Sequence, residues 1–242
     1  MKLTAKILLV MLMLFTTGLF ASNMILKSEY DKLDKSNTYW TYGKILEQPF
    51  KYLKIEGGNI TNIVFEPGKK SSVNVFKDWN GYRESKVKAS VKNDTLHLNF
   101  PNTYKDVYEK DWLKWNTMVH IISPELLSVE GFDTKLEMFK MKQKNINVSM
   151  SGKSAFELES YIAHFDTLHI TQSDSSEVVF EMSPDVKGPG TYTVHSVNAN
   201  LQGVSSLDLG RAEIDSLKFN IVDSSAIFFS GSTLKKIQQH KF

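Results

Sequence analysis

Residues 166–180 read DTLHITQSDSSEVVF, and residues 215–229 read DSLKFNIVDSSAIFF. The second stretch repeats the first after 49 positions, with five of fifteen residues identical. The identical residues are Asp166 and Asp215, Leu168 and Leu217, and the Asp-Ser-Ser triplets at 174–176 and 223–225. A self-match at a fixed period is the sequence signature of an architecture built from stacked units. The fold prediction therefore starts from this repeat.

Within each copy, apolar residues alternate with polar ones. The first copy has Leu168 and Ile170, then Val178 and Phe180, and Phe219 takes the place of Ile170 in the second copy. A period of two predicts a β-strand with one buried face. The Asp-Ser-Ser triplet predicts a turn, because short polar side chains bond the local backbone. Each copy is thus predicted as strand, corner and strand, with Ile170 and Phe219 facing the core.

A shorter echo precedes each copy, SAFEL at 154–158 and SSLDL at 205–209. Each unit therefore holds two corner-and-strand motifs, which corresponds to coils of about 20–30 residues. One such coil cannot bury its apolar face alone, so neighbours must stack about 4.8 Å apart. The predicted fold class is all-β, a single-domain β-solenoid or parallel β-helix-like stack over residues 50–242. An antiparallel sandwich of hairpins is the alternative, but the repeat preserves corner identity, which a sandwich does not require.

An apolar run lies near the N-terminus, behind Lys2 and Lys6. It reads ILLVMLMLFTTGLFAS over residues 7–22 and continues to Leu26. A positive flank before an apolar run is an export signal, and about 20 apolar residues also span the membrane once as a helix. We predict a signal peptide or single transmembrane anchor over residues 1–26. The anchor is favoured because no good pair of small residues precedes a cut.

This segment predicts a location at a membrane or beyond it. The lysines ahead of an uncleaved anchor keep the N-terminus in the cytoplasm and place the β domain outside it, with residues 7–26 in the inner membrane. Cleavage would instead release the domain into the periplasm or to the cell surface. Residues 27–49 are predicted to be a polar stalk, so that folded sequence begins at Phe50.

Residues 86–100, KVKASVKNDTLHLNF, predict a hairpin that turns at Lys92, Asn93 and Asp94. Residues 101–118, PNTYKDVYEKDWLKWNTM, then break the alternation with four aromatic residues at helical spacing. These are Tyr104, Tyr108, Trp112 and Trp115. We expect an insert that either covers an edge of the sheet or forms an aromatic binding surface, which would stack on sugar rings or grip another protein.

Four segments together carry a family resemblance. They read FKYLKIEGG (50–58), KVKASVKNDTLHLNF (86–100), VHIISPELLSVEGF (119–132) and NVSMSGKSAFELES (147–160). Over about residues 50–235 the chain resembles the family called putative auto-transporter adhesin, head GIN domain. The resemblance implies an exported envelope protein of the Bacteroidetes type with an N-terminal signal and a β-helical repeat domain. Its motifs include no catalytic signature, so no functional residue is carried over, and the aromatic insert and the glycine-poor coils depart from the family pattern.

Composition limits the chemistry. The 242 residues carry a net charge of +2 without long basic runs, which gives no indication of a nucleic-acid partner. The chain contains no cysteine, which excludes disulfides, thiolate metal sites, a cysteine nucleophile and a lipid-modified cysteine. The six histidines lack metal-ligand spacing, and no nucleophile elbow or phosphate-binding loop occurs. We therefore predict no catalytic residue, no cofactor and no metal site.

Asp174 and Asp223 are the one pair of carboxylates that invites a catalytic interpretation. They occupy equivalent corners two coils apart, roughly 9–10 Å if coils rise about 4.8 Å each. That is near the separation of about 6.5–9.5 Å between acid and base in inverting glycosidases. Aspartate before Ser-Ser is also a common turn residue that caps local amides.

The sequence thus favours a non-catalytic, exported envelope protein that displays its β-solenoid surface for adhesion, binding or envelope assembly. Surface glycans or envelope proteins are the expected partners, besides the membrane. A β-helical polysaccharide-active enzyme and a membrane-tethered sensory or regulatory ectodomain are the alternatives.

Overall fold

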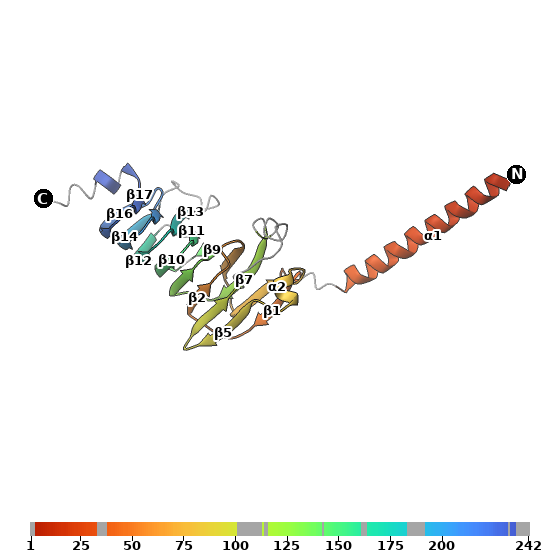
Figure 1. Ribbon diagram of the computed structural model, residues 1–242, viewed down its shortest axis with the longest axis horizontal. Coiled ribbons are helices and arrows are strands. Elements are labelled where there is room, and N and C mark those ends of the chain that lie inside the picture. The colour runs from red at the N-terminus through yellow and green to blue at the C-terminus, as the bar shows by residue number, and fades with distance from the viewer. Residues whose placement is uncertain are drawn as a thin grey trace. The chain divides into compact units, whose positions relative to one another are not determined.

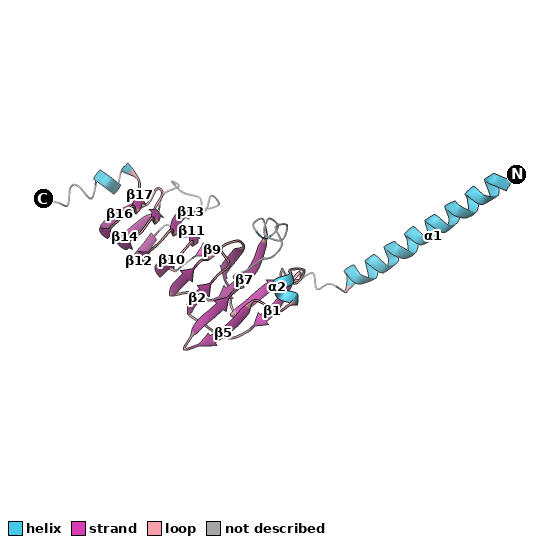
Figure 2. Cartoon of the chain, viewed as in Figure 1, coloured by secondary structure: helices cyan, strands magenta, loops and turns pink. Residues whose placement is uncertain are grey.

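The computed structural model describes residues 3–32, 38–100, 113, 116–141, 143–160, 164–182, 192–231 and 233–235 (Figure 1). The chain divides into two compact units, Met1–Thr41 and Tyr42–Phe242. The described part of the first unit is mainly one helix, and the second is built mostly of strands (Figure 2).

Helix α1 (Leu3–Asp31) contains the whole apolar run and has no buried residue. It is long and apolar enough to cross a membrane, a property that a signal sequence near an N-terminus shares. Its large apolar side chains, such as Leu8 and Phe20, are each 68% exposed. Leaving each such side chain in water costs about 1.5–3 kcal/mol relative to burying it. The helix therefore fits a signal or an anchor, as the sequence indicated.

The described strands of the second unit form two large mixed sheets. Sheet A has nine strands in the order β1 (Tyr42–Leu46), β4 (Ser72–Phe76), β7 (Thr117–Ser123), β3 (Asn62–Pro67), β9 (Lys135–Met141), β11 (Ala155–Ser160), β13 (Glu177–Met182), β15 (Ser206–Asp208), β17 (Ala226–Phe228). Sheet B has eight in the order β16 (Glu213–Ile221), β14 (Thr193–Leu201), β12 (His164–Gln172), β10 (Asn145–Ser151), β8 (Ser128–Phe132), β2 (Tyr52–Glu56), β6 (Thr95–Asn99), β5 (Lys88–Lys92). A short helix, α2 (Asn80–Arg83), lies between β4 and β5 in the chain.

From β8 onward the chain alternates between the two sheets, with even-numbered strands in sheet B and odd-numbered strands in sheet A. We call each sheet-B strand and the sheet-A strand that follows it a tier, from β8/β9 to β16/β17. Successive tiers pair in parallel in both sheets. In sheet B the register aligns Leu168 with Val197, and Val197 with Leu217. The 49-residue sequence repeat therefore spans two tiers, and these tiers pair in parallel, unlike the hairpins of an antiparallel sandwich.

The N-terminal part of the unit contains the antiparallel pairs. Strand β4 lies between β1 and β7 and is antiparallel to both, and β5 pairs antiparallel with β6. At the β5–β6 turn, Asn93 and Asp94 have φ angles of 51° and 58°. Two consecutive left-handed residues are typical of the type I′ turn, whose twist matches that of the flanking strands. The predicted hairpin is confirmed.

One hydrophobic core runs between the sheets, and the inward residues of the tiers fill it. Leu168, Ile170, Val178 and Phe180 are at most 1% exposed, which confirms their predicted inward positions. Aromatic rings contact each other across tiers, as Phe156 does with Phe180 at a centroid distance of 6.1 Å. Such tilted ring pairs add to the stabilisation from area burial alone.

The predicted burial of Phe219 is wrong. Its register is the expected one, since Phe219 pairs with Ala199 and Ala199 with Ile170. The Phe219 side chain is nevertheless 52% exposed, and Ile221 in the same strand is 36% exposed. The reason is that β16 is the last strand of sheet B in the described part of the chain, so no further described tier covers it.

Part of the predicted stalk, residues 27–49, belongs to the folded unit. Strand β1 pairs with β4, and the ring of Tyr42 lies 5.5 Å from Phe76 and 4.8 Å from His120, centroid to centroid. The Tyr42 hydroxyl also donates a hydrogen bond to the Thr117 carbonyl at 2.9 Å. These contacts are made with residues far along the chain, so the start of the fold is earlier than Phe50.

Candidate binding surface

The outer face of sheet B between β10 and β16 presents twelve described Asn, Ser, Thr, His and Lys side chains that alternate with inward-pointing ones. They are Asn145, Asn147 and Ser149 of β10, Thr167, His169 and Thr171 of β12, Ser196, Asn198 and Asn200 of β14, and Ser216, Lys218 and Asn220 of β16. We call these twelve residues the amide–hydroxyl face. Among them only Lys218 carries a permanent charge, because the others are Asn, Ser and Thr, with one His. The exposed Asp166, His195 and Asp215 lie nearer the start of the same strands.

Parallel register aligns the amide–hydroxyl face into columns that run across the strands. One column contains Ser149, Thr171, Asn200 and Asn220. Neighbours in such a column lie about 4.8 Å apart, because that is the spacing of paired strands. The Asn220 side-chain amide donates a hydrogen bond to Oδ1 of Asn200 at 3.1 Å. Such asparagine ladders favour in-register stacking.

A shallow groove of about 370 Å³ lies on this face. Its lining comes from residues 169–171, 198–200 and 218–220, in the middle of β12, β14 and β16. The amides and hydroxyls in it can both donate and accept hydrogen bonds. The arrangement is therefore suited to binding a polar ligand.

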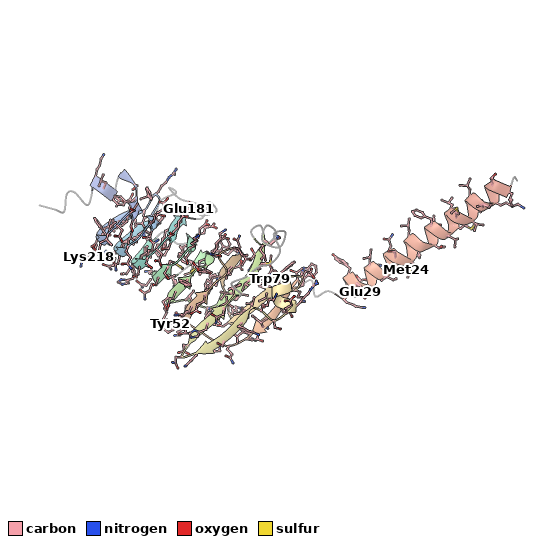
Figure 3. All side chains as sticks on the ribbon, in the orientation of Figure 1. Met24, Glu29, Tyr52, Trp79, Glu181 and Lys218 are labelled. Atoms are coloured by element: carbon pink, nitrogen blue, oxygen red, sulfur yellow. The ribbon has the colours of Figure 1, made fainter. Side chains whose placement is uncertain are left out.

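Two exposed aromatic residues lie on the same sheet beside the amide–hydroxyl face. Phe132 of β8 is 51% exposed and pairs with Ser151, and Tyr52 of β2 is 39% exposed. Tyr52 pairs with Ser128, which in turn pairs with Asn147, so it continues one of the columns. Figure 3 shows Tyr52 and Lys218 along one side of the strands and Glu181 on the other.

The outer face of sheet A is acidic. Glu137 and Glu157 are paired in register, and Glu159 pairs with Glu181 in the next strand. Partial burial raises the pKa of Glu157, and the charges of Glu137 and Glu181 raise it further. In the described part of the chain, no three His, Asp or Glu side chains converge to hold a metal ion. The amide–hydroxyl face and this acidic face of sheet A thus differ in charge.

Asp174 and Asp223 occupy the same corner of the stack, two tiers apart, as predicted. The carboxylate of Asp174 accepts a hydrogen bond from the Gly152 amide at 2.9 Å, and that of Asp223 from the Gly203 amide at 3.0 Å. Each carboxylate thus caps a backbone amide of the preceding tier. This geometry favours the turn-cap interpretation over an acid–base pair.

The predicted aromatic binding surface lies outside the described residues, since Tyr104, Tyr108, Trp112 and Trp115 all fall there. The amide–hydroxyl face was not predicted. Its signal in the sequence is the recurrence of Asn, Ser and Thr between inward residues, as in NINVS at 145–149 and VNAN at 197–200. Only the register shows that these short polar segments lie side by side.

Comparison with known proteins shows a fold likeness. No protein-family model and no curated protein matches the chain. Among solved structures, a protein described as a putative adhesin from Parabacteroides distasonis has a TM-score of 0.50 and 14% identity, covering 78% of this chain and 72% of that one. A putative adhesin from Parabacteroides merdae (TM-score 0.41, 11% identity, 78% and 95% covered) and a putative lipid binding protein from Parabacteroides distasonis (0.42, 11%, 78% and 96%) are also similar. At 14% identity, the first of these likenesses concerns the fold alone.

Proposed function

We propose that this chain is a non-catalytic, exported protein of the bacterial cell envelope that displays a β-solenoid surface for adhesion or binding. The observation that carries the proposal is helix α1, whose 29 residues are mostly apolar and include none that is buried. A helix of this kind ahead of a strand-rich unit fits a protein that is exported and held at a membrane.

The solenoid part of the proposal is supported by contacts between equivalent residues of successive tiers. The Asp133 carboxylate accepts a hydrogen bond from the Lys153 backbone amide, 20 residues later in the chain. The Asp174 carboxylate accepts one from the Gly152 amide, 22 residues earlier, and the Asn220 side-chain amide donates one to Asn200, 20 residues earlier. Each tier contacts its neighbours through both sheets. A quasi-one-dimensional stack with nearest-neighbour contacts is the hallmark of solenoid proteins.

The location follows from the charges around α1. Lys2 and Lys6 precede the apolar run, and positive residues stay on the cytoplasmic side of an anchor. Residues 7–26 then cross the inner membrane, and the unit from Tyr42 onward lies outside the cytoplasm. In this arrangement the domain faces surface glycans and envelope proteins.

The binding role is consistent with membership of the head GIN domain family of putative auto-transporter adhesins. It is supported by the fold likeness to the Parabacteroides distasonis protein described as a putative adhesin. From the sequence we also propose an aromatic binding surface at Tyr104, Tyr108, Trp112 and Trp115.

The proposal is tested with the full-length chain carrying a C-terminal epitope tag in a bacterial host. We expect the tag in the inner-membrane fraction, an N-terminus at or near Met1, and loss of the tag when protease is added to spheroplasts. A tag that is protected in spheroplasts and degraded only after lysis would place the domain in the cytoplasm and contradict export. An N-terminus between residues 19 and 24 would show that the segment is a cleaved signal peptide and not an anchor, and it would not contradict export.

A further inference from the structure

We propose that the amide–hydroxyl face binds an uncharged polysaccharide, held across strands β10 to β16. This inference rests on the proposed function, and it names the ligand class and the residues that bind it.

The side chains of the face match the hydrogen-bonding groups of a sugar. Ten of the twelve are Asn, Ser or Thr. An amide offers two donor hydrogens and an acceptor oxygen, and a hydroxyl both donates and accepts. Neighbouring sugar hydroxyls likewise donate and accept, so one amide can bond two of them. Short side chains also lose less rotamer entropy on binding than Lys, Arg or Gln do.

The spacing of the face suits a chain ligand. Columns such as Asn147, His169, Asn198 and Lys218 repeat one polar side chain per strand, about every 4.8 Å. A polysaccharide also repeats its hydroxyls at a fixed interval, so a chain that lies across the strands can present hydroxyls to several of them. The groove of about 370 Å³ over β12, β14 and β16 is within the usual size range of small-molecule sites, about 300–1,000 Å³.

Aromatic rings beside the face provide the apolar contact that sugar recognition uses. Tyr52 lies in line with the column through Asn147, and Phe132 lies in the strand next to β10. Both rings are exposed, at 39% and 51%. The C–H face of a pyranose ring can stack on such a ring while its hydroxyls reach the amides.

The charges of the face argue for a neutral ligand. Lys218 is the only permanently charged side chain among the twelve residues and in the groove lining, and the exposed Asp166 and Asp215 of the same strands lie outside that lining. Glu130 of β8, which pairs with Ser149, is neutralised by an ion pair with Lys54 at 2.6 Å. A charged partner is recognised by a patch of opposite charge, and the acidic outer face of sheet A has that character, for example at Glu157 and Glu181. Protein-binding patches are enriched in aromatic residues and depleted in serine, so the composition of the face favours a glycan over a protein.

The test uses the full-length chain in lipid nanodiscs, with biolayer interferometry against dextran, mannan, xylan and the acidic polymer polygalacturonate. The face variant is Asn198→Ala/Asn200→Ala, and a second variant, Thr171→Val, removes a hydroxyl without changing side-chain shape or strand propensity. The matched control is Glu157→Ala/Glu177→Ala, which alters outward residues of sheet A in tiers that adjoin the groove.

We expect the wild-type chain to bind at least one neutral polysaccharide. The double face variant should weaken that binding about tenfold or more, and Thr171→Val by about twofold to tenfold, since each removes ligand hydrogen bonds. The sheet-A control should bind like wild type. Thermal unfolding shows whether a variant is misfolded. If the double variant is misfolded, the polysaccharide binding of Thr171→Val decides the test.

Three results would overturn the inference. They are no binding to any neutral polysaccharide of the panel, wild-type binding by both face variants, and tighter binding of polygalacturonate than of the neutral polymers. None of them bears on export, which the spheroplast experiment measures separately.

Discussion

The carboxylate of Asp223 accepts a hydrogen bond from the backbone amide of Gly203, with 3.0 Å between Oδ2 and the nitrogen. The same relationship joins Asp174 to Gly152 two tiers earlier. Within the tiers, five residues follow one another at this corner: Asp133, Gly152, Asp174, Gly203 and Asp223. Their φ angles are 50°, 68°, 63°, 78° and 60°, in that order. Aspartate and glycine thus alternate along one corner of the stack, in the left-handed conformation that glycine adopts freely and aspartate tolerates.

Gly203→Ala should destabilise the protein. A Cβ at this position would lie 2.6 Å from the carbonyl oxygen of Asp174, and φ is 78°. Left-handed strain costs about 1–3 kcal/mol, and the clash with backbone adds to it. The measurement is thermal unfolding of the full-length chain in detergent. Gly231→Ala is the control, because a Cβ there meets no atom within 4 Å, and equal losses in the two variants would contradict the corner argument.

Substitution of Asp174 separates its capping role from catalysis. Asp174→Ala should destabilise the protein, because it removes the acceptor of the Gly152 amide and places alanine, which tolerates positive φ less well than aspartate, at a φ of 63°. A hydrogen bond to a charged group contributes about 1.5–3 kcal/mol. Asp174→Asn keeps an acceptor oxygen and should cost clearly less. Urea unfolding of both variants checks the order of stability.

The same carboxylates provide a test of the enzymatic alternative. If they only cap backbone amides, Asp174→Asn/Asp223→Asn should leave the reducing ends released from a polysaccharide panel unchanged from the wild-type value. Cleavage by the wild-type chain that disappears in this folded double variant would instead show an acid–base role.

Replacing a large side chain by alanine should cost less stability at the end of the stack than in its middle. Phe180 is 1% exposed and lies between two tiers, whereas Phe219 is 52% exposed in the last strand of sheet B. Phe180→Ala should cost about 3–5 kcal/mol, the usual loss for a buried ring. Phe219→Ala should cost about 1 kcal/mol, the centre of the distribution for single substitutions. Denaturant midpoints of the two variants give the comparison, and a larger loss at Phe219 would mean that something covers the end of sheet B.

The acidic face of sheet A should make stability depend on pH. The folded-state pKa of Glu157 is raised above 4.5 by burial and by Glu137 and Glu181. The folded state therefore holds this proton more tightly, and stability falls as pH rises from 4.5 through the folded pKa. Glu157→Gln removes this loss, so it should raise the Tm at pH 7 and leave it nearly unchanged at pH 4.

The control for this pH effect is Glu177→Gln. Glu177 is on the same face but pairs with Ala155 and Ser206, not with another glutamate. Its substitution should change the Tm little at either pH. An equal gain for Glu157→Gln at pH 4 and pH 7 would show that the effect is not electrostatic.

Features with a local cause were predictable from the sequence. Strict alternation around Leu168 and Phe180 identified strands and their inward residues, because side chains of a strand point to opposite faces. Asn93 and Asp94 identified the hairpin turn, since few residues accept its backbone conformation. The apolar run of α1 identified an export signal or anchor by length and flanking charge alone.

Features that depend on what lies beside a strand were decided by the tertiary structure. Ile170 and Phe219 have the same pattern in the repeat, yet Ile170 is 1% exposed and Phe219 is 52% exposed, because among the described strands a further tier covers only Ile170. The contacts of Tyr42 and the columns of the amide–hydroxyl face likewise join residues distant along the chain. Alternation specifies which way a side chain points, but burial and neighbourhood depend on which strand pairs with which, and in what register, and that is settled only when the sheets assemble.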